Sequence, residues 1–445
     1  MRNLILAFTF LLLAPMAALH AAAPPAELSA TAYPSIQKAI DANPGGPIYV
    51  PAGDYEISKA LLLRSDNSGL HGPGRIIQAN PNEPIIMVKG ATGVRLRDLT
   101  LTRPEGKMDT KAAGINATQC RDLRIDDVHV LDNRTTSEAG AIFLFECRES
   151  QIRGCIIENY CRISVDDRTA IPRDGITRYG YAFDCIDGTG ILVKFSKATL
   201  IQGCRVVERR LLPTPEVQQK FGLGKFVKKN PVKGTFISQK TWDEGRVTGW
   251  NQSGAIVITS AKVTDFAQVL GNYIENAGKG LDIHADHVTI SQNIVNNAHI
   301  GMKAMHGARN VIITGNQWTR IDLWAIGLMP GMASRPAEDG KPETDNSDGG
   351  SIIANNIISG FGHGNAHWMW GNEHSPFVFD AGQESDDPPL TDVIIQGNIV
   401  DCIGPPRYKF AVGLAGGAKG PKGLHFSGNI FAPGTAGIAN TKLPE

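Results

Sequence analysis

The stretch "VTISQN" (Val288–Asn293) recurs with variations along much of the chain, and this repetition decides the fold. It is preceded by "AQVLGN" (Ala267–Asn272) and followed by "VIITGN" (Val311–Asn316). Other copies are "SIIANN" (351–356), "VIIQGN" (393–398) and "LHFSGN" (424–429), and two earlier copies end in Cys, "SQIRGC" (150–155) and "TLIQGC" (199–204). Self-similarity with a short period is the signature of a repeat architecture.

The spacing of the copies limits what each unit can contain. Asn293 follows Asn272 by 21 residues, and Asn316 follows Asn293 by 23. Such a unit holds two or three strands and their turns but no crossover helix, so successive coils must stack as parallel strands. The sequence therefore predicts an all-β fold, a single-stranded parallel β-helix (solenoid). The Asn column is expected to form a ladder, with Cys155 and Cys204 as small buried substitutes for Asn rather than a disulfide.

The N-terminal part of the mature chain predicts a cap for this solenoid. Ser35–Ala42 has the pattern of a short amphipathic helix, and "PIYVPAGDYEIS" (47–58) has that of a strand, a turn and a strand. The stretch Tyr33–Ser58 resembles the N-terminal element of the pectate-lyase-like superfamily, which includes polygalacturonase-like and tailspike-like proteins. The resemblance implies a right-handed β-helix. Because this fold carries lyases, hydrolases, epimerases and non-enzymatic adhesins, function has to be argued from the site.

Composition and targeting signals set further limits. The chain has 44 basic and 44 acidic residues, which argues against bulk nucleic-acid binding and against an electrostatic membrane anchor. Residues 1–23 have the pattern of a cleaved signal peptide, so we expect a periplasmic or secreted protein with no membrane segment after cleavage. Residues 24–445 are expected to form one β-helix domain, active as a monomer. The seven Cys have no CxxC spacing, so a zinc site is not expected.

The stretch "GLDIHADHVTISQN" (Gly280–Asn293) carries the candidate site. Alignment of Asn272 with Asn293 places Asp282 on Lys303 and His284 on Met305, with Leu281 and Ile283 pointing inward. Neighbouring coils lie about 4.8 Å apart, so Asp282 and Lys303 should be side by side on the outer face. The same alignment adds further outward residues to this patch: Lys194, Thr259 and His306, the last at a strand end from which a turn can point it either way.

Four long insertions interrupt the coils near this patch: Cys161–Gly190, Arg209–Ser253, Gly331–Gly350 and Phe361–Pro376. Long loops of a solenoid usually project from one face and often bind ligands. The second insertion is rich in Lys, and the last is rich in His and Trp. A basic groove with aromatic residues suits an acidic polysaccharide, and the candidate substrate-binding residues are Arg178, Tyr181, Trp324, His363, His367 and Trp370. The alternative is that the Lys run is an ordinary solvated loop.

The patch has the groups needed to remove a proton next to a uronate carboxylate. His284 can act as the base, Asp282 can orient it, and Lys303, Lys194 or His306 can supply a cation or an acid. "GLDIHAD" is similar to the Asp-x-His-Asp motif of bacterial periplasmic mannuronan C5-epimerases, which implies the role of base for His284. The sequence departs from that motif at Ala285, and His306 stands near the place of the family's Arg. We expect a lyase ahead of an epimerase.

Two other functions remain open at this stage. A glycoside hydrolase needs two carboxylates across the scissile bond, and the candidates are Asp166, Asp167, Asp282 and Asp286. A non-catalytic glycan-binding protein would carry the same patch as ordinary surface polarity. No cofactor is firmly implied, although Asp282 and Asp286 could bind Ca²⁺.

Overall fold

The computed structural model describes residues 28–444 apart from 170–171, 174–175, 178–179, 235–236, 262, 330–346, 365–373, 381–388, 402–403 and 416–419. The expected signal peptide, Arg178, His367, Trp370 and Cys402 lie outside the described residues, as does most of the third insertion. Within the described part, no helix has the length and apolar character needed to cross a membrane.

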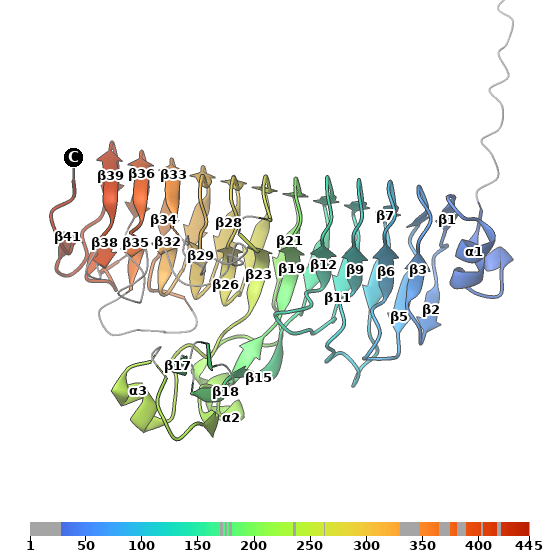
Figure 1. Ribbon diagram of the computed structural model, residues 1–445, viewed down its shortest axis with the longest axis horizontal. Helices are drawn as coiled ribbons and strands as arrows, with labels where there is room; N and C mark the ends of the chain where they lie inside the picture. Colours follow the sequence, from blue (N-terminus) through green and yellow to red (C-terminus); the bar gives the residue numbers. More distant parts are fainter. Residues whose placement is uncertain are drawn as a thin grey trace, which may run out of the picture.

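The described chain is a solenoid built from three long parallel sheets, A, B and C, each of twelve strands (Figure 1). Each coil contributes one strand to each sheet in turn, and every strand pairs with its counterpart in the next coil. The predicted parallel β-helix is confirmed. Sheet A contains β1 (Pro47–Tyr49), β4 (Gly69–His71), β7 (Arg95–Arg97), β10 (Arg124–Asp126), β13 (Gln151–Arg153), β20 (Leu200–Gln202), β24 (Gln268–Leu270), β27 (Thr289–Ser291), β30 (Ile312–Thr314), β33 (Gly349–Ala354), β36 (Thr391–Gln396) and β39 (Lys422–Ser427).

Sheets B and C run beside sheet A along the same axis. Sheet B contains β2 (Asp54–Ile57), β5 (Arg75–Gln78), β8 (Thr100–Thr102), β11 (His129–Leu131), β14 (Ile156–Glu158), β21 (Arg205–Val207), β25 (Tyr273–Glu275), β28 (Ile294–Asn296), β31 (Gln317–Thr319), β34 (Ile357–Ser359), β37 (Ile399–Asp401) and β40 (Ile430–Phe431). Sheet C contains β3 (Leu61–Leu63), β6 (Ile86–Lys89), β9 (Ile115–Thr118), β12 (Ile142–Phe145), β19 (Thr189–Lys194), β23 (Gly254–Thr259), β26 (Lys279–Ile283), β29 (Ile300–Met305), β32 (Trp324–Met329), β35 (Ser375–Asp380), β38 (Phe410–Ala415) and β41 (Gly437–Ala439).

Inward-facing apolar residues from all three sheets form one continuous core, and an Asn ladder runs along the turn between sheets A and B. Each ladder Asn donates its amide to the next: Asn272 to Asn293 (2.9 Å), Asn293 to Asn316 (3.0 Å), Asn316 to Asn356 (3.0 Å), Asn356 to Asn398 (2.9 Å) and Asn398 to Asn429 (3.0 Å). Buried amides stay paired this way in an otherwise apolar core. The backbone N–H of Cys204 donates to Asn272 at 2.9 Å, and Cys155 and Cys204 are buried free thiols, as predicted.

The N-terminal end is capped by a short helix, as predicted. The 3₁₀ turn η1 (Ala30–Ala32) precedes α1 (Ile36–Ala42), and the side chain of Ser35 caps α1 by accepting the backbone N–H of Lys38. Ile36, Ala39 and Ile40 face the open end of the first coil and belong to its core. Figure 1 shows α1 closing this end of the solenoid.

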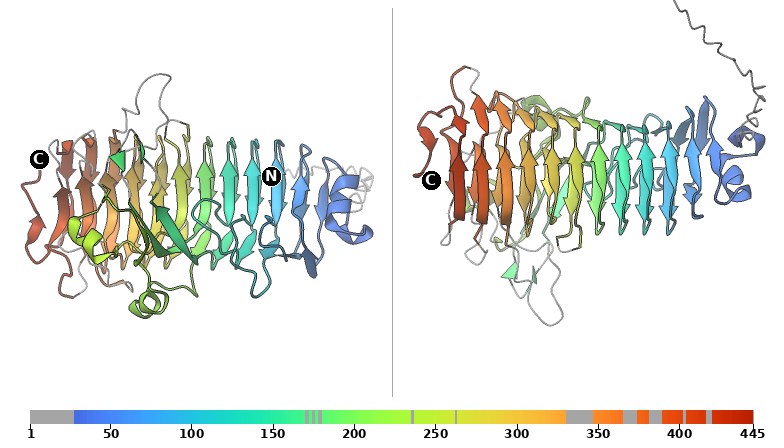
Figure 2. Two further views of the ribbon diagram at one scale, coloured as in Figure 1. Left: turned by 60° about the horizontal axis from the view of Figure 1, so that its bottom comes forward. Right: turned by 90° about the horizontal axis from the view of Figure 1, so that it is seen from above.

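Two of the insertions are more than loops, which the sequence analysis did not foresee. β15 (Arg162–Arg168), β18 (Tyr181–Asp187) and β22 (Phe226–Lys229) form an antiparallel sheet, beside the short pair β16 (Pro172–Arg173) and β17 (Ile176–Thr177). The helices α2 (Pro215–Phe221) and α3 (Gln239–Glu244) complete this small subdomain, which has its own apolar cluster. It projects from one side of the central coils (Figures 1 and 2).

Candidate functional site

The site lies on the outer face of sheet C, where β26 and β29 pair. Their register sets Asp282 beside Lys303, as predicted, with Val257 on one side of this pair and Gly327 on the other. Leu281 and Ile283 point into the core because side chains alternate along a strand. The insertions Cys161–Gly190 and Arg209–Ser253 both lie between a strand of sheet B and a strand of sheet C, so the small subdomain leaves the solenoid at that edge of sheet C.

The patch is not open to solvent as the sequence analysis assumed. The side chain of Asp282 is 9% exposed, and those of Lys303 and Lys279 are 14% and 16% exposed. Within this enclosure Asp282 Oδ1 lies 3.4 Å from Lys303 Nζ and 2.8 Å from His284 Nε2, and Oδ2 lies 3.8 Å from Lys279 Nζ. Burial by itself raises the pKa of Asp282, but Lys303, His284 and Lys279 outweigh it and hold that pKa well below its usual range.

Among the described residues, the ammonium groups of Lys279 and Lys303 both lie near the single carboxylate of Asp282. The pKa of Lys303 is lowered to about 8, chiefly by burial and to a smaller extent by Lys279 and Arg168, while Asp282 opposes this. The pKa values of both partners thus fall: the cations outweigh burial for the carboxylate, and burial outweighs the carboxylate for the ammonium group. A site with this excess of positive charge is ready to take up an anionic group from a ligand.

His284 and His306 meet at the end of the two strands. The rings lie edge to face, 4.8 Å between centroids, because His306 adopts a left-handed backbone (φ 58°) directly after β29. Of the two orientations that the sequence left open for His306, the structure has the one facing the patch. His284 Nδ1 lies 3.5 Å from Thr259 Oγ1 in the preceding coil. Lys194 pairs with Thr259, so it lies two coils, or roughly 10 Å, from His284, and outside the cluster of Lys279, His284 and Lys303 around Asp282 that was expected to include it.

The small subdomain adds a residue that the sequence analysis missed. Arg168, at the end of β15, is paired with Asp166 at 2.7 Å and donates to Gln252 Oε1 at 3.3 Å. Lys279 Nζ lies 3.4 Å from the same Gln252 oxygen, so this amide joins the subdomain to the site. No periodic pattern marks Arg168, because it lies in an insertion and meets Gln252 across 84 residues of sequence.

The predicted substrate-binding residues are divided between several environments. The ring of Trp324 lies against Gly327, the outward neighbour of Lys303, so Trp324 borders the site. Tyr181 is 3% exposed and stacks on Phe226 in the core of the subdomain, which leaves little of it for a substrate. His363 lies in the turn after β34, between sheets B and C.

The Lys run of the second insertion serves largely local contacts. Lys228 is paired with Asp167 at 3.3 Å, Lys240 lies 3.9 Å from Glu244, and Lys229 donates to the backbone carbonyl of Trp242. These contacts fit the alternative of a solvated surface. The positive charge of the candidate site comes from Lys279, Lys303 and Arg168 instead.

The carboxylates considered for hydrolysis or for a metal are dispersed. Asp167 is paired with Lys228 in the subdomain, and Asp286 accepts the backbone N–H of Arg309 at 3.2 Å. Asp166 reaches the site only through Arg168. Among the residues that the structure describes, no group of three or more His, Cys, Asp or Glu could hold a metal ion.

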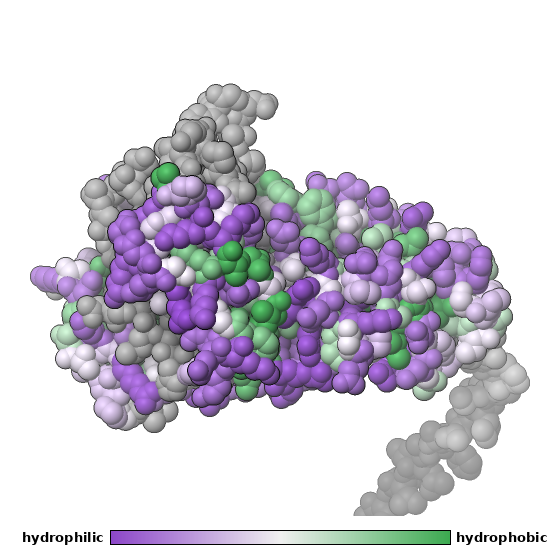
Figure 3. Space-filling view, turned by 90° about the horizontal axis from the view of Figure 1, so that it is seen from below, coloured by the Kyte–Doolittle hydropathy of each residue, from purple (hydrophilic) through white to green (hydrophobic). Residues whose placement is uncertain are grey.

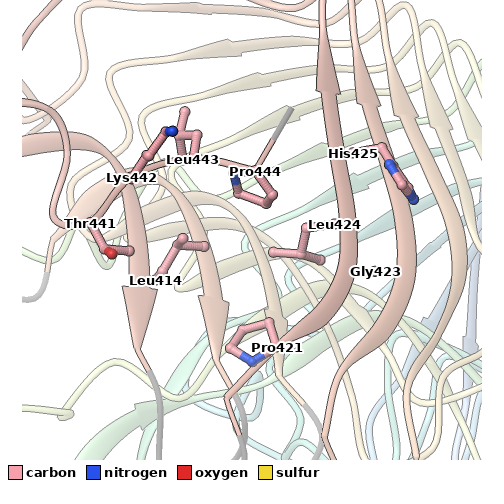
Figure 4. A pocket seen from close by; sticks show the side chains of 9 residues that line it. All are labelled: Leu414, Pro421, Gly423, Leu424, His425, Thr441, Lys442, Leu443 and Pro444. Carbon is pink, nitrogen blue, oxygen red and sulfur yellow. The ribbon is translucent and has the colours of Figure 1, made fainter.

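A separate cavity of about 790 Å³ lies at the C-terminal end, lined by residues of β38, β39 and the last segment, among them Leu414, Leu424 and Leu443 (Figure 4). It contains none of the charged residues described above. Figure 3, seen from the side on which the subdomain projects, shows apolar surface interspersed among polar surface around the insertions.

The comparisons with known proteins identify the fold. Neither a protein-family model nor a curated protein matches the sequence. The structure is similar to the A-module of the Azotobacter vinelandii mannuronan C-5 epimerase AlgE4, with 12% identity, 90% of each chain covered and a TM-score of 0.53. It is also similar to the endo-xylogalacturonan hydrolase of Aspergillus tubingensis, with 11% identity, 91% of this chain and 90% of that chain covered and a TM-score of 0.50.

A third similar structure is the tailspike of Escherichia coli bacteriophage HK620 in complex with a pentasaccharide, with 11% identity and a TM-score of 0.53. The match covers 90% of this chain and 63% of the tailspike chain. At these identities the likeness concerns the fold alone. The chain is a right-handed parallel β-helix, as predicted.

Proposed function

We propose that this protein is an exported, monomeric carbohydrate-active enzyme that acts on a uronate-containing polysaccharide. It removes the proton next to the sugar carboxylate, with β-elimination as the outcome. One observation carries the proposal: a histidine and two lysines surround the carboxylate of Asp282 in a largely buried site on the outer face of sheet C. An acidic sugar supplies a second negative charge to the two lysines.

The geometry gives each group a task. His284 Nε2 lies 2.8 Å from Asp282, so that a proton on Nε2 is held by the carboxylate and Nδ1, which faces Thr259 at 3.5 Å, is the nitrogen that takes the C5 proton of the sugar. The electron pair of that C–H bond forms the C4–C5 double bond as the C4–O bond breaks. The leaving oxygen takes a proton from an acid, for which His306 and Lys303 are the candidates on this patch. Lys279 and Lys303 neutralise the charge that grows on the sugar carboxylate during proton removal.

The structural neighbours support a glycan as the partner. They include an epimerase of mannuronan, a hydrolase of xylogalacturonan and a tailspike in complex with a pentasaccharide. C5-epimerisation shares the first step proposed here, and hydrolysis would use Asp166 as the second carboxylate, since its partner Arg168 brings it to the edge of the site.

The test is a panel of acidic glycans (polymannuronate, polyguluronate, polygalacturonate, hyaluronan and chondroitin), assayed for unsaturated products by ultraviolet absorbance and for new reducing ends. We expect both signals together. New reducing ends without absorbance would identify a hydrolase, inversion at C5 without cleavage an epimerase, and no turnover a binding protein.

The variant His284→Ala tests the assignment of the base. Loss of an acid–base catalyst lowers rates by roughly 10²–10⁴-fold. The control is Asp286→Ala two residues further on, which changes a carboxylate outside the patch and should affect turnover much less. A folded His284→Ala variant with near-normal turnover would show that His284 is not the base.

A further inference from the structure

The outer face of sheet C carries a group of aromatic residues beyond the candidate site. β12 contributes Phe143 and Phe145, and the turn after β19 contributes Phe195. The ring centroid of Phe145 lies 6.0 Å from that of Phe143 and 5.5 Å from that of Phe195. All three side chains are partly exposed. None belongs to the interior core, so their apolar rings are not explained by packing of the solenoid.

These phenylalanines are continuous with the site. Phe145 pairs with Lys194, Lys194 with Thr259, and Thr259 contacts His284. In the neighbouring column Phe143, Leu192 and Val257 lead to Asp282. Phe145 is three coils from His284, or roughly 14 Å, which is further than one sugar ring extends.

Cations flank the aromatic rings on this face. Lys194 Nζ lies 5.4 Å from the ring centroid of Phe195. Beyond Phe145 in the same column come Thr118 and then Lys89. An alternation of aromatic rings and ammonium groups is complementary to a chain whose sugar rings have apolar C–H faces and whose edges carry carboxylates.

We propose that Phe145 and Phe195, with Lys194, form a second sugar-binding subsite for the same acidic polysaccharide, in the coils N-terminal to His284. This inference rests on the proposed function, since it takes the reacting sugar to be at His284. The position of His284 Nδ1 on the Thr259 side agrees with it, because that side faces these coils. The polysaccharide then runs along the solenoid axis, and chains long enough to span both subsites are preferred over disaccharides.

The experiment compares Phe145→Ala, Phe195→Ala and Lys194→Gln with the wild type on the glycan that the panel identifies, as polymer and as disaccharide. Each variant should raise KM for the polymer on the order of tenfold, the effect of losing one aromatic face or one charge contact, and leave kcat/KM for the disaccharide within about twofold. Lys194→Gln removes no aromatic ring, so it keeps the test valid if a Phe variant fails to fold.

The control is Tyr273→Ala, which removes an aromatic ring lying 4.6 Å from Arg205 on sheet B, away from the site. This variant should leave KM for the polymer and kcat/KM for the disaccharide unchanged. An active wild type with variants that bind polymer normally would overturn the subsite and leave the proposed function intact. If the wild type turns over no glycan, calorimetry measures whether it binds the panel polymers. Binding that Phe145→Ala weakens would support the subsite, although the enzymatic proposal would fail. Absence of binding would overturn both proposals.

Discussion

Replacement of Asp282 by Asn tests whether the buried charge cluster behaves as its geometry requires. The variant keeps the shape of the side chain but removes the carboxylate that lies near both Lys279 and Lys303. Breaking a buried ion pair by removing one partner costs about 3–5 kcal/mol, because a charge is left buried without compensation. We expect a loss of this size in the free energy of unfolding near pH 6.

The loss should depend on pH with a definite sign. Burial already lowers the pKa of Lys303 to about 8, and removal of Asp282 lowers it further. In the unfolded state Lys303 has a pKa near its ordinary value of 10.5, so it binds more protons than folded Lys303 once the pH exceeds the folded pKa, and stability then rises with pH. In the variant this rise begins below pH 8, whereas in the wild type it begins at about pH 8. The difference in the free energy of unfolding between wild type and variant therefore shrinks up to about pH 8 and is constant above it.

Urea unfolding of both proteins between pH 5 and pH 9 measures this difference. Asp286→Asn is the matched control: Asn keeps a side-chain oxygen that can accept the backbone N–H of Arg309, so the loss should stay below about 1 kcal/mol. The double variant Asp282→Asn/Lys303→Met should be more stable than Asp282→Asn alone, because it removes the uncompensated cation. A loss under about 1 kcal/mol for Asp282→Asn, with no change between pH 6 and pH 8, would refute this account of the site.

The other predictions concern the pH dependence of turnover, the Asn ladder and the effect of a chelator. Turnover should fall above pH about 8 as Lys303 loses its proton. Lys303→Arg, if active, should shift this fall in the pH–rate profile to higher pH, because a guanidinium stays charged. A profile that Lys303→Arg leaves unchanged would exclude Lys303 as the group responsible. Asn293→Ala should lower the free energy of unfolding by roughly 1–3 kcal/mol for each ladder group that it leaves unpaired. Asn293→Cys should lower it by less, because Cys occupies this column in two other coils. Ser291→Ala, which changes an outward side chain, should change it by no more than about 0.5 kcal/mol. A chelator should leave turnover unchanged, because lysines neutralise Asp282; loss of activity restored by Ca²⁺ would contradict this.

The fold could be predicted because its constraints are local and repeated. Each coil must place apolar residues inward, and a slip of one residue would turn Leu281 and Ile283 outward, so the register is strongly specified. From Asn272 onward, an Asn at a fixed place in each coil aligns successive coils, which is why the pairing of Asp282 with Lys303 followed from counting residues. The cap was predictable for a similar reason, since Ser35 gives a local N-cap signal before an amphipathic turn.

The surroundings of the site could not be predicted in the same way. Cys161–Gly190 and Arg209–Ser253 fold against each other, and the contacts between β15, β18 and β22 have no repeat to reveal them. The sequence therefore showed neither Arg168 beside Gln252 nor the burial of Tyr181. The enclosure of Asp282 was missed too, because outward residues of a solenoid are normally in solvent and only the insertions change that.

This enclosure is itself an argument for function. Ion pairs removed from water seldom stabilise a fold, and apolar residues in their place would often serve stability better. The neighbouring coils of sheet C show such residues in the same column, with Leu192 and Val257 before Asp282 and Val378 after Gly327. A carboxylate, a histidine and two lysines in the middle of that column are costly to the fold in the absence of a ligand. Their excess of positive charge is reduced when an anionic group binds, so the arrangement favours the bound state of an acidic substrate over the empty site.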